Sequence, residues 1–269
     1  MRFNGGAALP WSRVERILSG RPGPTPVPVD HVPDATDTPK VGHSAVPFAE
    51  LHAVSSYSFL RGASEPEELV ARSVELGMQG MALVDRDGFY GLMKFAEAAA
   101  KVGLPAVFGA ELSLEPAPLT VLARTPEGYR RLSRLISRAR MEAGEKDAVR
   151  YPPLAEIAAD LQDECLFLVG WEWAEHFDLL LERIKIDSMV LEYSCTQTPE
   201  DADHHAALDE LPVPRAIATA RPAAATRDRA RLAGAKQALS QRLALADASP
   251  NTHPMGAPWL RSGDQMAQL

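Results

Sequence analysis

Three short apolar runs in this chain end in side chains of the kind that hold metal ions. The first run ends in His52, the second is followed by Asp85 and Asp87, and the third ends at Glu111. Imidazole and carboxylate groups that converge on one point bind Zn²⁺, Mn²⁺ or Fe in sites that hydrolyse phosphate esters. A catalytic metal site needs at least three ligands and an oriented second shell, so these residues by themselves favour hydrogen-bonded strand ends and a simple turn at 85–88 over a metal site.

These side chains can meet only if neighbouring strands of one sheet position them. Seven runs rich in β-forming residues are predicted as strands, at 49–54, 80–84, 105–112, 119–123, 165–170, 188–193 and 216–219. Amphipathic helical stretches separate most of them, which implies parallel strands. Seven strands favour a closed barrel, whose functional sites lie at the carboxyl ends of the strands.

Capping residues mark where the helices begin and end. Ser64, with Pro66 and Glu67 after it, is typical of an N-cap with a capping box, and Gly77 is typical of a C-cap. Further helices are predicted over 91–102, from Thr125 onward, over 227–246 and after Ser262.

The composition is that of a globular protein with an acidic balance. The chain has 269 residues, 46% of them hydrophobic, and a net charge of −8. That charge argues against binding of a nucleic-acid backbone by this segment alone, because such binding needs clustered Lys and Arg.

Cys165 and Cys195 are interpreted as buried thiols in a reducing compartment. No apolar run reaches the roughly 18 residues of a membrane span, and the start of the chain lacks the apolar core of a secretory signal. We therefore predict a cytoplasmic protein without membrane contact.

The first part of the chain differs in composition from the rest. Residues 20–47 hold seven prolines and little periodic apolar sequence, which predicts a linker. Before the linker, Trp11, Val14, Ile17 and Leu18 have helical spacing and predict a short helix. Residues 1–47 are therefore expected to form an extension outside the barrel.

Three stretches resemble the PHP (polymerase and histidinol phosphatase) domain of bacterial C-family DNA polymerases. They read LHAVSSYSFLRGASEPEELVARSVELG, MALVDRDGFYGLMKFAEAAAKVGLPAVFGAEL and LTVLARTPEGYRRLSRL. The resemblance is closest to the actinobacterial error-prone branch, which is similar to the replicative alpha subunit and belongs to a mutagenesis cassette. It implies an α/β fold, a distorted seven-stranded β/α (TIM-like) barrel with an N-terminal Pro-rich extension. On this pattern residues 1–47 form the helix and linker, 48–250 the barrel, and 251–269 the start of a connection toward a polymerase palm.

Several positions of the family's metal site hold other residues here. The family's first motif is His-x-His, which this chain matches with His52 and then Val54. Arg61 stands where the family places Asp before Gly-Ala-Ser. Arg86 stands where the family's Thr-Asp-His ends in an imidazole, while the Glu of the third motif is kept as Glu111.

The later motifs depart from the pattern in the same way. Pro118 replaces a His before the fourth strand, and near the last strand Arg221 and Ala223 replace an acid and a His. The resemblance therefore leaves four vestigial metal-site positions, His52, Asp85, Asp87 and Glu111, and no catalytic residues. Because guanidinium groups repel metals and can neutralise carboxylates themselves, we expect Asp85 and Glu111 to pair with arginines in a salt-bridged plug without metal.

The resemblance implies a scaffold role with one alternative. As a scaffold, the chain would be the amino-terminal PHP portion of an error-prone polymerase, acting in translesion synthesis, DNA replication and DNA repair. Its partners would be the rest of the polymerase chain and, through the full-length protein, DNA and accessory mutagenesis proteins. Nucleotidyl transfer needs Mg²⁺ in a palm that this chain does not contain. The alternative is a residual phosphoesterase or 3′–5′ proofreading exonuclease that binds Mn or Zn through the surviving residues.

Overall fold

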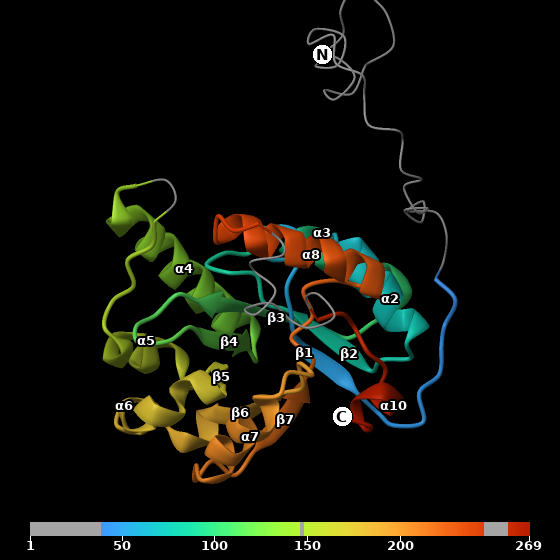
Figure 1. Ribbon diagram of the computed structural model, residues 1–269. Coiled ribbons are helices and arrows are strands. Elements are labelled where there is room, and N and C mark those ends of the chain that lie inside the picture. The colour runs from blue at the N-terminus through green and yellow to red at the C-terminus, as the bar shows by residue number, and fades with distance from the viewer. Residues whose placement is uncertain (1–38, 146–147, 245–257) are drawn as a thin grey trace, which may run out of the picture. The chain divides into compact units, whose positions relative to one another are not determined.

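A single curved sheet forms the centre of the protein (Figure 1). The computed structural model describes residues 39–145, 148–244 and 258–269. Within them, seven strands are hydrogen-bonded in chain order: β1 (Ala49–Ala53), β2 (Gly80–Leu83), β3 (Ala106–Leu112), β4 (Leu119–Ala123), β5 (Cys165–Val169), β6 (Met189–Ser194) and β7 (Ala216–Thr219). Each strand begins and ends within one residue of its predicted range.

The first and last strands of the sheet come together. The amide of Ala220, just after β7, donates to the side chain of Glu50 on β1 at 2.8 Å. The amide of Val54, just after β1, donates to the carbonyl of Pro222 at 3.1 Å. The sheet therefore curls into a nearly closed barrel, and the predicted seven-stranded α/β barrel is confirmed.

The expectation that all strands are parallel is wrong at β4. β4 pairs antiparallel with both β3 and β5, whereas the other neighbouring strands are parallel. A parallel crossover needs a dozen or more residues, and only residues 113–118 connect β3 to β4. As a result, the start of β4 lies at the same edge as the carboxyl ends of the other strands. Pro118 therefore lies at the barrel mouth although it precedes its strand.

Helices surround the barrel and fill most of the connections between strands (Figure 1). They are α2 (Pro66–Glu75), α3 (Leu92–Val102), α4 (Pro126–Ala143), α5 (Leu154–Leu161), α6 (Phe177–Leu181), α7 (Asp201–Asp209), α8 (Arg227–Ser240) and α10 (Gly263–Met266), with 3-10 turns at Trp171–His176 and Ile186–Ser188. Thr125 caps α4 and Ser262 caps α10, as the sequence predicts. Across the parts of the chain that the structure describes, none of these helices is both long and apolar enough to cross a membrane.

The predicted cap of α2 is wrong by one residue. Glu65 is the N-cap, and it exchanges capping-box hydrogen bonds with Glu68. Ser64 is fully buried, and its hydroxyl instead accepts a hydrogen bond from the amide of Ala225 at 3.0 Å. The hydroxyl thus fixes the chain after β7 against the start of α2, a long-range contact that capping rules do not include. Gly77 follows the end of α2 in the left-handed conformation, with φ of 68°.

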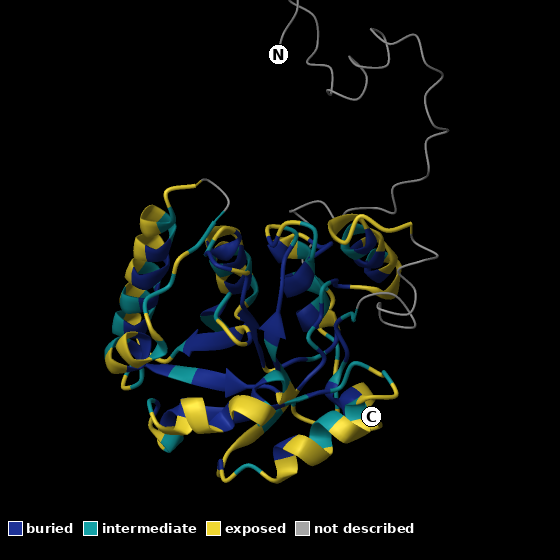
Figure 2. Cartoon of the chain, turned by 60° about the vertical axis from the view of Figure 1, so that its left-hand side comes forward, coloured by how far each residue is buried: buried dark blue, intermediate teal, exposed yellow. Residues whose placement is uncertain are grey.

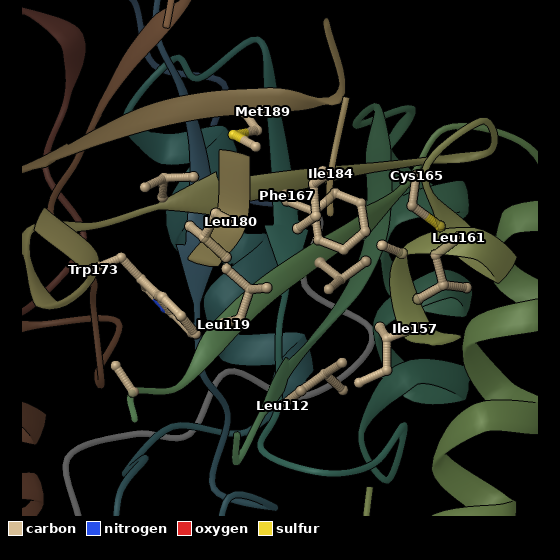
Figure 3. Packing of buried hydrophobic residues seen from close by; sticks show 14 of the residues in the cluster. Leu112, Leu119, Ile157, Leu161, Cys165, Phe167, Trp173, Leu180, Ile184 and Met189 are labelled. Carbon is tan, nitrogen blue, oxygen red and sulfur yellow. The ribbon is translucent and has the colours of Figure 1, made fainter. Parts of the chain in front are cut away.

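The strands and the helix sides that face them are mostly buried, as the dark blue segments of Figure 2 show. Most of the buried residues are apolar. The layer between β3–β6 and the helices around them is packed by large side chains such as Leu119, Phe167 and Trp173 (Figure 3). A smaller cluster of Val54, Ala82, Val84, Leu122, Leu168 and Val190 packs within the sheet.

The last described segment packs on the barrel. Trp259 forms a bridge with Ala224, Leu260 is 1% exposed among the side chains of β1 and β2, and Asp264 accepts hydrogen bonds from two amides of residues 45 and 46. The division of the chain at residues 48 and 250 stays a prediction. Three predicted parts lie outside the described residues: the helix near residues 11–18, residues 20–38 of the Pro-rich linker, and residues 245–246 of the helix expected over 227–246.

Candidate functional site at the barrel mouth

His52, at the end of β1, lies between two carboxylates at the barrel mouth. Its Nδ1 is 2.7 Å from Oε1 of Glu192 on β6, and its Nε2 is 3.7 Å from Oε2 of Glu111 on β3. All three side chains are buried, and the hydroxyl of Thr219 also donates to Glu192 at 2.6 Å. Burial lowers the pKa of His52, but Glu192 and Glu111 outweigh it and raise the pKa to about 9. Between these carboxylates the imidazole is therefore a cation at neutral pH, and a metal would have to displace its proton to bind it.

Arg61 occupies the other side of Glu111. Both terminal nitrogens of Arg61 donate to the carboxylate, Nη2 at 3.3 Å from Oε2 and Nη1 to Oε1. Burial alone would raise the pKa of Glu111, but His52 and Arg61 hold it well below its usual range. The loop that carries Arg61 turns tightly at Gly62, where a Cβ atom would lie 1.9 Å from the carbonyl oxygen of Ser55. Two cations thus share the one carboxylate that the family pattern keeps from its third motif.

Arg221 extends the chain of charges beyond β7. Its Nη2 is 2.9 Å from Oε2 of Glu192, and both of its terminal nitrogens donate to Glu172, which follows β5. Arg221 adopts a φ of 44°, an uncommon conformation for a residue with a side chain. Positive and negative side chains therefore alternate along one chain of ion pairs: Arg61, Glu111, His52, Glu192, Arg221 and Glu172. These ion pairs connect the ends of β1, β3, β5, β6 and β7.

The expectation that an arginine pairs with Asp85 is wrong. The Asp85 carboxylate accepts hydrogen bonds from the Ser55 amide at 2.8 Å, the Ser55 hydroxyl at 2.8 Å and the Ser58 hydroxyl at 2.7 Å. Arg86 instead donates from Nε to Ser113 at 2.6 Å and lies 3.8 Å from a carboxylate oxygen of Glu111. Successive side chains in extended chain point to opposite sides, so Asp85 and Arg86 do not face each other.

Asp87 is held by a different set of neutral donors. Its carboxylate accepts from the Ser113 amide at 2.8 Å, the Ser113 hydroxyl at 2.6 Å and the Tyr151 hydroxyl at 2.9 Å. Its own backbone carbonyl accepts from Arg140 at 3.1 Å. Burial and the nearby Asp87 carboxylate raise the pKa of Tyr151, which keeps the phenol protonated as a donor. Asp87 therefore stabilises the loop after β2 and the packing of α4 against it.

The remaining replaced positions offer no ligand side chains. Val54 packs in the apolar cluster within the sheet. Pro118 is exposed, and its carbonyl accepts a hydrogen bond from the indole of Trp173 at 2.8 Å. Ala223 pairs through its backbone with Ala63 and Pro258. These positions are built into the fold as packing and backbone contacts.

The side chains at this mouth do not fit a divalent cation. His52 is protonated between two carboxylates, and Glu111 is already neutralised by Arg61. Asp85 has its oxygens engaged by serine hydroxyls and an amide. A metal would have to displace these donors and enter beside fixed guanidinium charges. The arrangement orders the strand ends.

Three acids of the site were missed by sequence reasoning: Glu50, Glu172 and Glu192. Glu50 is fully buried, and its carboxylate accepts hydrogen bonds from the amides of His52 at 2.9 Å and Ala220 at 2.8 Å. Burial raises the pKa of Glu50 to about 7. The signal for Glu192 was a single acid inside the apolar run Met189–Ser194. Because a charged residue inside a buried strand needs a partner, this single acid could have identified Glu192 as part of a buried polar site.

Comparison with known proteins places the chain among relatives that are much longer. Residues 50–202 match the PHP domain family. An error-prone DNA polymerase of Corynebacterium glutamicum is 47% identical over 99% of this chain and 26% of its own length. One of Mycobacterium bovis is 39% identical over 96% of this chain and 27% of its own length. The chain therefore spans about a quarter of the length of these relatives.

Among solved structures, an amidohydrolase of Chromobacterium violaceum is similar at a TM-score of 0.38 and 16% identity, over 60% of this chain and 81% of that chain. A likeness of this size carries no weight for function.

The raised pKa values of His52 and Glu50 predict that the fold loses stability as the pH rises. Between pH 6.5 and about 9 the folded chain holds the His52 proton more tightly than the unfolded chain, so the free energy of unfolding falls across this window. Glu50 adds a fall of the same sign between pH 4.5 and about 7. We expect the melting temperature to decrease from pH 7 to pH 9, as measured by differential scanning fluorimetry at constant ionic strength.

The variant His52→Gln tests the origin of this fall. It should melt at a lower temperature than the parent chain near pH 6.5, and its melting temperature should change less up to pH 9, because the titrating imidazole is gone. If the melting temperature fell equally steeply with pH in the two proteins, the proton on His52 would not stabilise the fold.

The contacts of Asp85 predict a contrast between two alanine variants. Ser58→Ala removes a donor to a buried carboxylate and should lower the free energy of unfolding by about 1–3 kcal/mol in urea denaturation. Arg86→Ala removes a side chain that is 44% exposed and does not contact Asp85, so it should cost less than about 1 kcal/mol. If Arg86→Ala lowered the free energy of unfolding more than Ser58→Ala, the Arg86 guanidinium would be the group that stabilises Asp85.

Proposed function

The chain belongs to the PHP domain family, and from that premise we propose that it is the PHP portion of an error-prone DNA polymerase. In this proposal the domain is metal-free and catalytically inactive, and it serves the polymerase as a scaffold. The relatives that are 39% and 47% identical over nearly all of this chain are named error-prone DNA polymerases and extend far beyond it. The activity of the whole protein would come from those further regions, because nucleotidyl transfer needs carboxylates that hold two metal ions.

One observation carries the metal-free part of the proposal: Arg61 binds Glu111 with both terminal nitrogens while His52 lies on the other side of the same carboxylate. A guanidinium is always charged and planar, and it matches a carboxylate with two parallel hydrogen bonds. It thus supplies the positive charge that a bound metal would supply, without an open coordination position for water. Hydrolysis of a phosphate ester at a metal site depends on such a position.

The scaffold role would be performed by the charged groups of the mouth. Arg221 ties Glu192 on β6 to Glu172 after β5, and His52 ties Glu192 to β3 through Glu111. These contacts join strand ends that are far apart in sequence and would keep the barrel rigid without a bound ion. A rigid barrel is what a docking domain offers to the rest of a polymerase.

The wider setting follows from the same proposal. The partners would be the rest of the polymerase chain and, through it, DNA and accessory mutagenesis proteins in translesion synthesis and DNA repair. The compartment would be the cytoplasm. The alternative is a phosphoesterase or 3′–5′ exonuclease with Mn or Zn. It would require Arg61 to leave Glu111 and His52 to lose its proton.

Metal analysis separates the two functions. After incubation with MnCl₂ or ZnCl₂ and removal of free metal, we expect far less than one metal ion per chain by elemental analysis, because the mouth has no free ligand set. The melting temperature should not rise with MnCl₂, since a ligand stabilises only the state that binds it. The variant His52→Gln is the matched control, because metal retained equally by that variant is bound elsewhere. One Mn²⁺ per chain that is lost in both His52→Gln and Glu111→Gln would contradict the proposal.

A further inference from the structure

Helix α8 presents its small residues to the protein and its large apolar residues to the solvent. Its inward side consists of Ala230, Ala233, Gly234 and Ala238, all buried. Ala230 and Ala233 pack against Ala63 and Ala224 of the loops below. On the opposite side Leu232 is 42% exposed and Leu239 is 63% exposed, and Leu243, just after the helix, is 42% exposed. We call Leu232, Leu239 and Leu243 the leucine stripe.

This arrangement is the reverse of an ordinary amphipathic helix. Helices on the surface of a globular protein normally turn their large apolar side chains toward the core. Leu232 and Leu239 are seven residues apart, which is about two turns, so they lie on the same side of α8. A partner that covered these leucines would remove apolar surface from water, which favours binding. Single exposed leucines are common, but exposed leucines that lie close together can form an interaction surface.

The charges around the leucine stripe are mostly positive. α8 carries Arg227, Arg229, Arg231 and Lys236 but only one acid, Asp228. Arg229 pairs with Glu68 of α2 at 2.6 Å, and Lys236 donates to the carbonyl of Gly62 at 2.7 Å. Arg231 is exposed on the surface of the helix. α8 therefore carries more cations than acids next to the stripe on a chain whose net charge is −8, although Glu68 neutralises Arg229 and Arg227 lies over the ring of Trp259 at 5.9 Å.

We propose that the leucine stripe is a docking surface for an acidic amphipathic helix supplied by another protein. The leucines would cover the apolar face of that helix, and the cations of α8 would face Asp and Glu residues beside it. A second copy of the same chain fits less well, because two α8 helices would bring like charges together. Nucleic acid fits less well, because leucine side chains contribute nothing to binding phosphates. The proposal goes beyond the scaffold function and does not depend on it.

A pair of synthetic helical peptides tests both parts of this surface. One peptide has leucines at heptad positions flanked by Glu, and the other has the same leucines flanked by Lys. Fluorescence anisotropy of the labelled peptides against the whole chain should show that the Glu peptide binds at least about tenfold more tightly than the Lys peptide. The double variant Leu232→Ser/Leu239→Ser should weaken the Glu peptide by about tenfold or more, and Arg231→Glu should also weaken it.

Leu179→Ser/Leu181→Ser is the matched control, because these leucines of α6 are 39% and 45% exposed but lie outside the stripe. It should bind the Glu peptide like the parent chain. Equal affinity for both peptides, or unchanged binding by the Leu232→Ser/Leu239→Ser variant, would overturn the proposal. So would a clear fall in the melting temperature of that variant, which would show that the chain itself covers the leucines. A dimer in sedimentation that the variant dissociates would assign the stripe to a second copy.

Discussion

The imidazolium of His52 lies between the carboxylates of Glu111 and Glu192, and the rest of the barrel mouth depends on this contact. Both carboxylates are almost fully buried, and an uncompensated buried charge is costly. One cation between them neutralises part of each charge, and Arg61 and Arg221 complete the compensation from either side. Removing any one of the three cations leaves a buried acid without its full set of partners. The ends of β1, β3 and β6 are therefore coupled through electrostatics as well as through the sheet.

This constraint links the positions at which the chain departs from the family's pattern. Both terminal nitrogens of Arg61 bind the carboxylate oxygens of Glu111 that a metal ion would otherwise need. Val54 and Ala223 lack the imidazoles expected there and contribute packing or backbone contacts instead. Asp85 and Asp87, which the family pattern also keeps, are satisfied by serine and tyrosine hydroxyls that order the loops around them. The mouth is thus a polar network in which the carboxylates of Glu111, Glu192, Asp85 and Asp87 all accept hydrogen bonds, while Nε of Arg221 is buried without a hydrogen-bond partner.

The sequence predicts the strands well because each is a short apolar run between turn residues, and these runs match the observed boundaries closely. It predicts the positions of His52 and Glu111 at one mouth because both lie near the carboxyl ends of parallel strands of one sheet. The direction of β4 was not predicted, since alternation of strands and helices says nothing about a six-residue connection between β3 and β4. Glu192 and Arg221 were not predicted as partners, because their contact depends on the pairing of β6 with β7 and on the turn after β7, which local patterns do not show. The predictions for Ser64 and Asp85 were also wrong because local patterns do not include long-range contacts. Ser64 was predicted as a helix cap but accepts a hydrogen bond from the amide of Ala225, and Asp85 was predicted in an ion pair but accepts one from the hydroxyl of Ser58.

A crystal structure grown in the presence of MnCl₂, with diffraction measured at the manganese absorption edge, tests the central claim most directly. If guanidinium groups and an imidazolium neutralise the carboxylates of the mouth in place of metal ions, the crystals will show no anomalous peak near His52. Arg61 will be bound to Glu111, and Arg221 will be bound to Glu192. An anomalous peak between His52 and Glu111, with the Arg61 side chain turned away, would contradict it.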